Sequence, residues 1–420
     1  MPKSVQFTKG FQGMSRHTTP TAADPFAAVG TASDLVERAT AMIPRLRERA
    51  AATEAERRPS DQTCLELKQS GIVQLFQPSR YGGAEARLRA GVDVIAAIGR
   101  GCGSTAWIVV QNITHNMMIA SWPEAAQDAV WMDAPDALVS GILIPGVGKA
   151  QKTDGGYVLS GRWPFVSGVD VADWLMFTAG CANANGDVED RHFLVARSRA
   201  TILDTWYAIG LKGSASNDVV VENVFVPEHM MVTLDQLKGH GSGPGHDVNP
   251  SPIYQIPPYA LFGCYIGSAA LGIAEAAVSY YIAGATHRSA TMSGAGVSSY
   301  TTQQVKVAEA QSAVITARRL LYSICDEAQD IVDAHRMTTV EDRTRFRALA
   351  AYAGRLTASA VNLVLEAGGG RVIYDRDPLS RCVADMIVAA RHTTQNWDVN
   401  ASTYGRALLG LPIDVPALEN

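Results

Sequence analysis

Apolar residues recur every three to four positions between Ser33 and about Met132. This spacing is typical of amphipathic helices, and Pro59-Ser60-Asp61 supplies a break between two of them. The segment Ser104–Ala120 is nearly uncharged, which indicates a buried helix. We therefore predict an N-terminal helical domain over residues 31–135, preceded by a flexible polar arm over residues 1–30.

The pattern changes between Ala137 and about Thr233, where short runs rich in β-branched and aromatic residues alternate with turn residues. Successive runs lie too close together to leave room for crossover helices, so an antiparallel barrel or sandwich is expected. We predict this β domain over residues 136–237. A loop rich in glycine and proline is predicted to follow it over residues 238–258.

Helical spacing returns after the loop and continues to the end of the chain. The apolar positions predict four long helices that pack as an antiparallel four-helix bundle over residues 259–420: Ala260–His287, Thr302–Ala334, Thr339–Ala367 and Leu379–Leu409. The expected fold class is therefore α+β and mostly α, with a helical domain, an antiparallel β-barrel or sandwich, and a four-helix bundle.

Composition narrows the possible functions. Hydrophobic residues make up 47% of the 420 positions, enough for a large core, and the net charge is −5. An acidic balance argues against a nucleic-acid partner. Six cysteines without a CxxC pair, together with the lack of an HExxH motif, predict reduced thiols and no metal site. The longest uncharged apolar run, Tyr259–Ala274, is short for a membrane span, and residues 1–20 lack the apolar core of a secretory signal. We expect a cytoplasmic protein that has no membrane partner.

The order of the three domains resembles the acyl-CoA dehydrogenase superfamily. Five segments carry this resemblance in the same order as in the superfamily: Trp163–Gly168, Gly210–Asp218, Val224–Glu228, His287-Arg288 and Gly368–Gly370. Four further segments are similar to its flavin-dependent monooxygenase branch: Gly101–Trp107, Thr114–Met117, Trp122–Glu124 and Arg391–Asp398. That branch includes the oxygenase components of two-component p-hydroxyphenylacetate and hydroxy-secosteroid hydroxylases, and dibenzothiophene monooxygenase.

The resemblance implies a reaction. Reduced FMN or FAD would react with O2 to form a C4a-hydroperoxyflavin, which transfers one oxygen atom to a small aromatic, phenol-like substrate. It also implies a homotetramer built as a dimer of dimers. No GxGxxG motif lies between a predicted strand and a helix, so a separate flavin reductase is expected to supply the reduced flavin.

Three residues are expected to carry the chemistry if the resemblance holds. Ser167 would lie beside the flavin N5, although a serine at a strand end more often satisfies the backbone of a turn. His392 would assist proton transfer to the flavin peroxide, whereas a lone histidine on a helix is more often structural. His115 lies in an uncharged helix and needs a buried partner, which is either a protein group or the substrate phenol.

The resemblance also implies which residues contact the two ligands. The expected flavin contacts are Ser167 and eight others: Trp163, Phe165, Val166, Ser214, Ser216, Asn217, Arg288 and Gly369. Arg288 and Gly369 would come from a second subunit, although a cation at a helix end is also explained by the helix dipole. The expected substrate contacts are His115 and four others: Trp107, Met117, Ser140 and Trp397.

Three other functions are compatible with parts of this pattern. One is N- or S-oxygenation of an amine, an indole-type heterocycle or a thiophene, which needs no base to deprotonate a phenol. Another is acyl-CoA dehydrogenation, but Arg376 stands where many dehydrogenases have a catalytic glutamate, and an arginine does not abstract a proton. Asp375 and Asp377 flank Arg376 and leave a displaced base open. The last is a non-catalytic helical assembly protein that binds no flavin.

Overall fold

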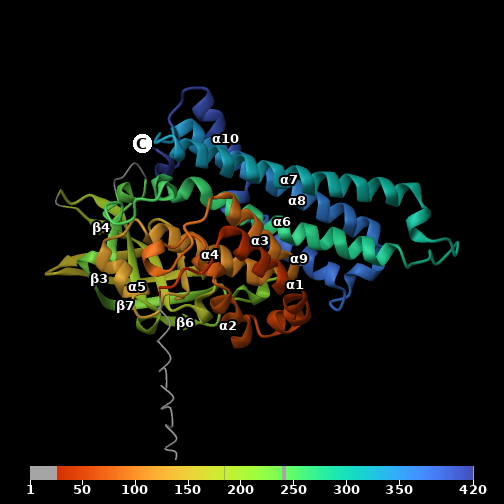
Figure 1. Ribbon diagram of the computed structural model, residues 1–420, viewed down its shortest axis with the longest axis horizontal. Coiled ribbons are helices and arrows are strands. Elements are labelled where there is room, and N and C mark those ends of the chain that lie inside the picture. The colour runs from red at the N-terminus through yellow and green to blue at the C-terminus, as the bar shows by residue number, and fades with distance from the viewer. Residues whose placement is uncertain (1–25, 184, 239–242, 420) are drawn as a thin grey trace, which may run out of the picture.

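A computed structural model describes residues 26–183, 185–238 and 243–419. Most of the predicted flexible arm lies outside these residues. Figure 1 shows three layers, with the N-terminal helices between a sheet and a long helical bundle. The fold class is as predicted. The first layer contains five α-helices within the described residues: α1 (Ala32–Ala55), α2 (Asp61–Ser70), α3 (Arg89–Gly101), α4 (Gly103–Ile119) and α5 (Glu124–Trp131).

Eight strands form one sheet within the described part of the chain: β1 (Val139–Ile142), β2 (Gly148–Thr153), β3 (Gly156–Val166), β4 (Trp174–Ala182), β5 (Val188–Ala196), β6 (Thr201–Leu203), β7 (Asn217–Pro227) and β8 (Met231–Thr233). The order along the sheet is β6-β7-β3-β2-β4-β5-β8, and β1 pairs with β4. The sheet is mixed rather than purely antiparallel, because β1 and β2 each run parallel to β4. The prediction of an all-antiparallel arrangement was wrong in this detail, since the chain between β3 and β4 makes no hairpin.

The third layer contains α6 (Pro258–Ala285), α7 (Thr301–Asp333), α8 (Val340–Gly368), α9 (Pro378–Ala389) and α10 (Trp397–Leu408). The last predicted helix, Leu379–Leu409, is two helices in the structure. Polar side chains cap new turns at the break: His392 Nδ1 accepts a hydrogen bond from Thr394 N, and Asn396 Oδ1 accepts from Asp398 N. Side-chain caps of this kind replace the helix's own hydrogen bonds, so His392 lies in a turn between α9 and α10.

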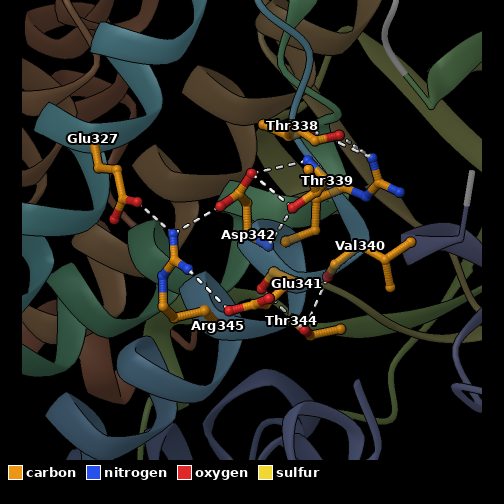
Figure 2. A network of polar contacts seen from close by, with 9 residues as sticks. Glu327, Thr338, Thr339, Val340, Glu341, Asp342, Thr344 and Arg345 are labelled. Atoms are coloured by element: carbon orange, nitrogen blue, oxygen red, sulfur yellow. Dashed lines mark hydrogen bonds and ion pairs between the residues drawn. The ribbon is translucent and has the colours of Figure 1, made fainter. Parts of the chain in front are cut away.

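A polar network fixes the start of α8 (Figure 2). Thr339 and Asp342 form a capping box, in which each side chain bonds the backbone N–H of the other residue. Arg345 pairs with Asp342 and with Glu327 of α7, which ties the two helices together.

Two described helical segments, α6 and Val340–Ile373, are long and apolar enough to cross a membrane by length and composition alone. In α6, 89% of the apolar window is buried inside the protein, as expected for a helix in the core of a soluble protein. The corresponding share in the second segment is 50%.

Candidate active site

One face of α4 forms a wall of the candidate site. All residues of this helix are buried, and Trp107, Gln111 and His115 share one face because they are four positions apart. Polar groups on a fully buried helix have no access to solvent water. The indole N–H of Trp107 and the imidazole of His115 therefore need partners from neighbouring elements.

The end of β3 places a serine against that wall. The pairing of β3 with β7 shifts register between Trp163 and Val166, and Phe165 adopts a positive φ of 60°. This irregularity turns the Phe165 ring outward, where it is 57% exposed and packs edge-on against Trp206. Ser167 follows at the strand end and is buried.

Ser167 belongs to a row of hydroxyl groups. Its Oγ accepts a hydrogen bond from Trp107 Nε1 at 3.2 Å and lies 2.8 Å from Ser216 Oγ. Ser216 Oγ lies 2.7 Å from Ser214 Oγ, and Gly168 N donates to the Ser214 carbonyl at 2.8 Å. Because a hydroxyl both donates and accepts, this row can exchange its internal bonds for bonds to a ligand.

The segment that carries Ser214 and Ser216 is held by the bundle. Asp385 of α9 accepts a hydrogen bond from Leu211 N at 2.6 Å, and Gly213 N donates to Ser104 Oγ at 3.2 Å. Burial raises the pKa of the Asp385 carboxyl to about 7, and the charge of nearby Glu54 acts in the same direction. All three layers therefore contribute to the position of the serine row.

His392 lies on the other side of Trp107. The two ring centroids are 5.6 Å apart, and the Phe262 ring lies 5.9 Å from the imidazole. Burial and the charge of Arg347 lower the pKa of His392 to about 4, so the ring is neutral at pH 7. Because Nδ1 accepts the Thr394 N–H at 3.2 Å, the proton of the neutral ring is on Nε2. His392 therefore offers an N–H donor.

His115 has the opposite arrangement. Its Nδ1 lies 3.3 Å from the carbonyl oxygen of Val139, which only accepts, so Nδ1 carries the proton. Burial lowers the pKa of this imidazole to about 4, and no described residue hydrogen-bonds Nε2. His115 therefore holds a free lone pair, as a general base requires.

Ser140 is next in sequence to the residue that His115 bonds. It follows Val139 in β1, and its buried Oγ has no hydrogen-bond partner within the described chain. A Cβ atom added to Gly168 would approach this oxygen to 2.9 Å, which places the hydroxyl beside the residue after Ser167. An unpaired buried hydroxyl is costly, so a ligand that bonds it is expected.

Two of the predicted flavin contacts have structural duties instead. Trp163 is fully buried inside the sheet, where it stacks on Phe177 and donates to the Thr178 carbonyl. The prediction for Trp163 is corrected, because the bulge after it turns Phe165 and not Trp163 toward the outside. Asn217 bonds Thr205 N and Trp206 N through Oδ1 and Asp170 through Nδ2, so it positions the Trp206 turn. Val166 is also enclosed in the core.

Four more predicted residues have no hydrogen bond or ring contact with the serine row or the two histidines within the described chain. Arg288 donates to the Gly368 carbonyl beside Gly369. It follows the C-terminal end of α6, and Figure 1 shows this end of the bundle pointing away from the sheet. The ring of Trp397 packs against the exposed ring of Tyr352 on α8, and the two ring centroids are 5.4 Å apart. Met117 belongs to the hydrophobic core. The assignments of Trp397 and Met117 as substrate contacts stay predictions.

Two polar residues of this region were not predicted. Gln111 is 5% exposed and lies between Trp107 and His115 on the same face of α4. Gln111 is four positions from Trp107 and four from His115, and this spacing could have identified it in the sequence. Arg347 of α8 is buried close to His392, and nothing in the local sequence distinguishes it from the arginines on either side.

The residues present fit a reduced flavin. The flavin ring carries N–H donors and carbonyl acceptors along one edge, which match hydroxyl groups that donate and accept. The exposed Phe165 ring and the buried Trp107 offer apolar contact beside those hydroxyls. The unpaired Ser140 hydroxyl and the free His115 Nε2 leave a second set of polar atoms for a substrate.

Comparisons with known proteins agree with this geometry. The sequence profile of the acyl-CoA dehydrogenase N-terminal domain matches residues 31–134, and that of the C-terminal domain matches residues 264–397. A pigment production hydroxylase from a Rhodococcus species is 31% identical over 92% of this chain and 99% of its own length. The oxygenase component of p-hydroxyphenylacetate 3-hydroxylase from Acinetobacter baumannii is 29% identical over 90% of each chain.

A solved structure adds the cofactor class. XiaF from a Streptomyces species, solved in complex with FADH2 and glycerol, has a TM-score of 0.86 and 28% identity, and the match covers 92% of this chain and 97% of that one. The matches extend along both chains, and the relatives are named as hydroxylases and oxygenase components. The chain therefore belongs to the acyl-CoA dehydrogenase family, in its branch of flavin-dependent monooxygenases that act as the oxygenase components of two-component aromatic hydroxylases.

Proposed function

We propose that this enzyme hydroxylates a small phenolic substrate, with reduced FMN or FAD bound along the row of Ser167, Ser216 and Ser214. The observation that carries the proposal is the opposite protonation of two neutral histidines. His115 presents a bare Nε2, and His392 presents an Nε2–H group. Hydroxylation of a phenol uses both, because a lone pair accepts a hydrogen bond from the phenolic O–H and an N–H group stabilises the negative charge that develops on the departing oxygen.

Reduced flavin, when bound, activates dioxygen and supplies one oxygen atom to the substrate. Ser167 would hydrogen-bond the N5 edge of the ring and replace its present bond to Ser216. Trp107 donates to the same oxygen and holds it in place. The surrounding apolar residues exclude water, which otherwise diverts the bound oxygen to hydrogen peroxide.

The substrate would bind between α4 and β1. His115 Nε2 accepts a hydrogen bond from the phenolic O–H, which raises the electron density of the aromatic ring, and the free Ser140 hydroxyl bonds the same oxygen. His392 donates from the opposite side of Trp107. Both histidines have pKa values of about 4, so these roles persist across neutral pH.

We further propose a homotetramer, a separate flavin reductase and a cytoplasmic location. Arg288 and Gly369 support the tetramer, because Arg288 bonds the Gly368 carbonyl beside Gly369 and neither residue contacts the serine row within the described chain. The names of the relatives as oxygenase components support the reductase.

The test mixes the anaerobic protein and chemically reduced FMN or FAD with oxygenated buffer and a panel of phenols. Hydroxylated product, hydrogen peroxide and oxidised flavin are measured together. The variant His115→Asn keeps an N–H donor for the Val139 carbonyl but lacks the base. We expect it to lower product formation about 100-fold or more while flavin oxidation continues. Unchanged hydroxylation by this variant would contradict the proposal and favour oxygenation of nitrogen or sulfur.

A matched pair tests the donor. His392→Gln retains an N–H group at the position of Nε2, whereas His392→Asn retains only the acceptor that caps the Thr393–Gln395 turn. We expect the glutamine variant to keep more product formation than the asparagine variant. Equal activities of the two would remove the donor role of His392.

A further inference from the structure

Three arginines alternate along the first two turns of α8, and two of them are paired. Arg343 donates to the Leu418 carbonyl at 2.9 Å and to the Thr338 carbonyl at 2.8 Å. Arg345 pairs with Asp342 and Glu327 (Figure 2). The third, Arg347, has a different environment.

Arg347 is a buried cation without a counter-ion. Its side chain is 8% exposed, and no ion pair or hydrogen bond joins it to any other described residue. The Nε atom is enclosed and unpaired, and the two terminal nitrogens are not enclosed in this way. Burial lowers the pKa of the guanidinium to about 10, which still leaves it charged at neutral pH. A buried charge without a partner is strongly unfavourable, so an anion from outside the chain is expected.

The position of Arg347 connects it to the candidate active site. Its positive charge contributes to the lowered pKa of His392. Seven residues further along α8, on the same face, Gly354 contacts Gln395 in the turn that follows His392: a Cβ atom on Gly354 would lie 2.4 Å from Gln395 Oε1. That Oε1 is also buried without a hydrogen-bond partner within the described chain. The unpaired groups therefore gather on the bundle side of His392.

We propose that Arg347 forms an anion-binding subsite that receives a carboxylate group of the aromatic substrate. The proposal rests on the proposed function and deepens it, because it assigns the substrate a negative charge. The flavin is the other anionic ligand of the reaction, but its proposed contacts are the serine row beside Trp107, whereas Arg347 belongs to α8 of the bundle and its charge acts on His392. A substrate that spans both sides would place its ring near His115 and its carboxylate near Arg347.

The subsite is tested by binding alone, without flavin. Isothermal titration compares two carboxylates with their uncharged alcohols: 4-hydroxyphenylacetate with 4-hydroxyphenethyl alcohol, and indole-3-acetate with indole-3-ethanol. We expect at least one carboxylate to bind the wild-type protein about 10- to 100-fold more tightly than its alcohol, as for a hydrogen bond between charged groups. Arg347→Met should abolish this preference, and Arg347→Lys should retain part of it. Equal affinities, or no binding of either carboxylate, would overturn the proposal.

A control variant separates binding from stability. Arg345→Met removes a paired cation from the same helix and should leave the preference for carboxylates unchanged. Arg347→Met should not lower the thermal midpoint, because it removes an unpaired buried charge. A large loss of stability in Arg347→Met would assign the arginine a structural partner and refute the subsite. The proposed function fails separately, if the wild-type protein with reduced flavin hydroxylates none of the phenols.

Discussion

The carboxyl group of Asp385 should make the stability of this enzyme depend on pH in a predictable direction. Asp385→Asn replaces a buried acid by a neutral amide whose Oδ1 can still accept the Leu211 N–H. Burial raises the pKa of Asp385 from 3.8 to about 7 in the folded protein. The folded state therefore holds a proton that the unfolded state releases between these two pH values.

The magnitude follows from this difference. The contribution of Asp385 to stability is fully present below pH 3.8 and is lost as the pH rises through about 7. The loss is about 1.4 kcal/mol per pH unit within that window. Between pH 5 and pH 7 the wild-type protein should therefore lose about 2 kcal/mol relative to Asp385→Asn. With an unfolding entropy of about 2 cal/mol/K per residue, this corresponds to a difference of about 2–3 °C in thermal midpoint for 420 residues.

The assay measures the thermal midpoints of both proteins in matched buffers from pH 5 to pH 8. Other titrating groups contribute equally to the two proteins, so the difference isolates Asp385. Asp133→Asn makes the same substitution at an exposed position and serves as the surface control. A pH-independent difference between Asp385→Asn and wild type, or a relative gain of the wild-type protein as the pH rises, would refute the reasoning.

Two further predictions concern the serine row. Ser167→Ala removes one hydrogen bond to the bound flavin, so stopped-flow absorbance should show oxidised flavin appearing about 2- to 10-fold sooner, with more hydrogen peroxide per turnover; an unchanged delay would exclude the role of this hydroxyl. Gly168→Ala places a Cβ atom 2.9 Å from Ser140 Oγ at a φ of 79°. We expect this variant to lower the thermal midpoint and to weaken phenol binding in titrations, whereas phenol affinity equal to wild type would show that the Ser140 hydroxyl is not a substrate contact.

Most of the fold could be predicted from the spacing of apolar residues, because this spacing reflects which face of each helix or strand is buried. The uncharged run around His115 correctly indicated a buried helix. The break at His392 escaped the same reasoning, since apolar spacing continues through α9 and α10 while side-chain caps interrupt the backbone. The opposite orientations of Trp163 and Phe165 were also missed, because a strand bulge between Trp163 and Val166 interrupts the alternation of side chains without a clear sequence signal.

The unpaired state of Arg347 could not be predicted from sequence for a related reason. Whether an arginine has a counter-ion depends on groups that tertiary packing brings near it, and Arg343 and Arg345 look the same in the sequence. The groups that surround each guanidinium in the folded protein determine whether it is solvated, paired or enclosed without a partner. Polar atoms left without partners in a packed interior therefore carry functional information that residue spacing does not.

The short joint between α9 and α10 has a consequence for how this scaffold accommodates different reactants. The imidazole of His392 is aimed by a few backbone torsions of a turn rather than by the register of a helix. The adjoining helices begin with their own caps at Asp377 and Asn396, so each is stabilised independently of the joint. An insertion or deletion at Arg391 would thus change the direction of the His392 N–H group to suit a larger or smaller ring and leave the two helices intact.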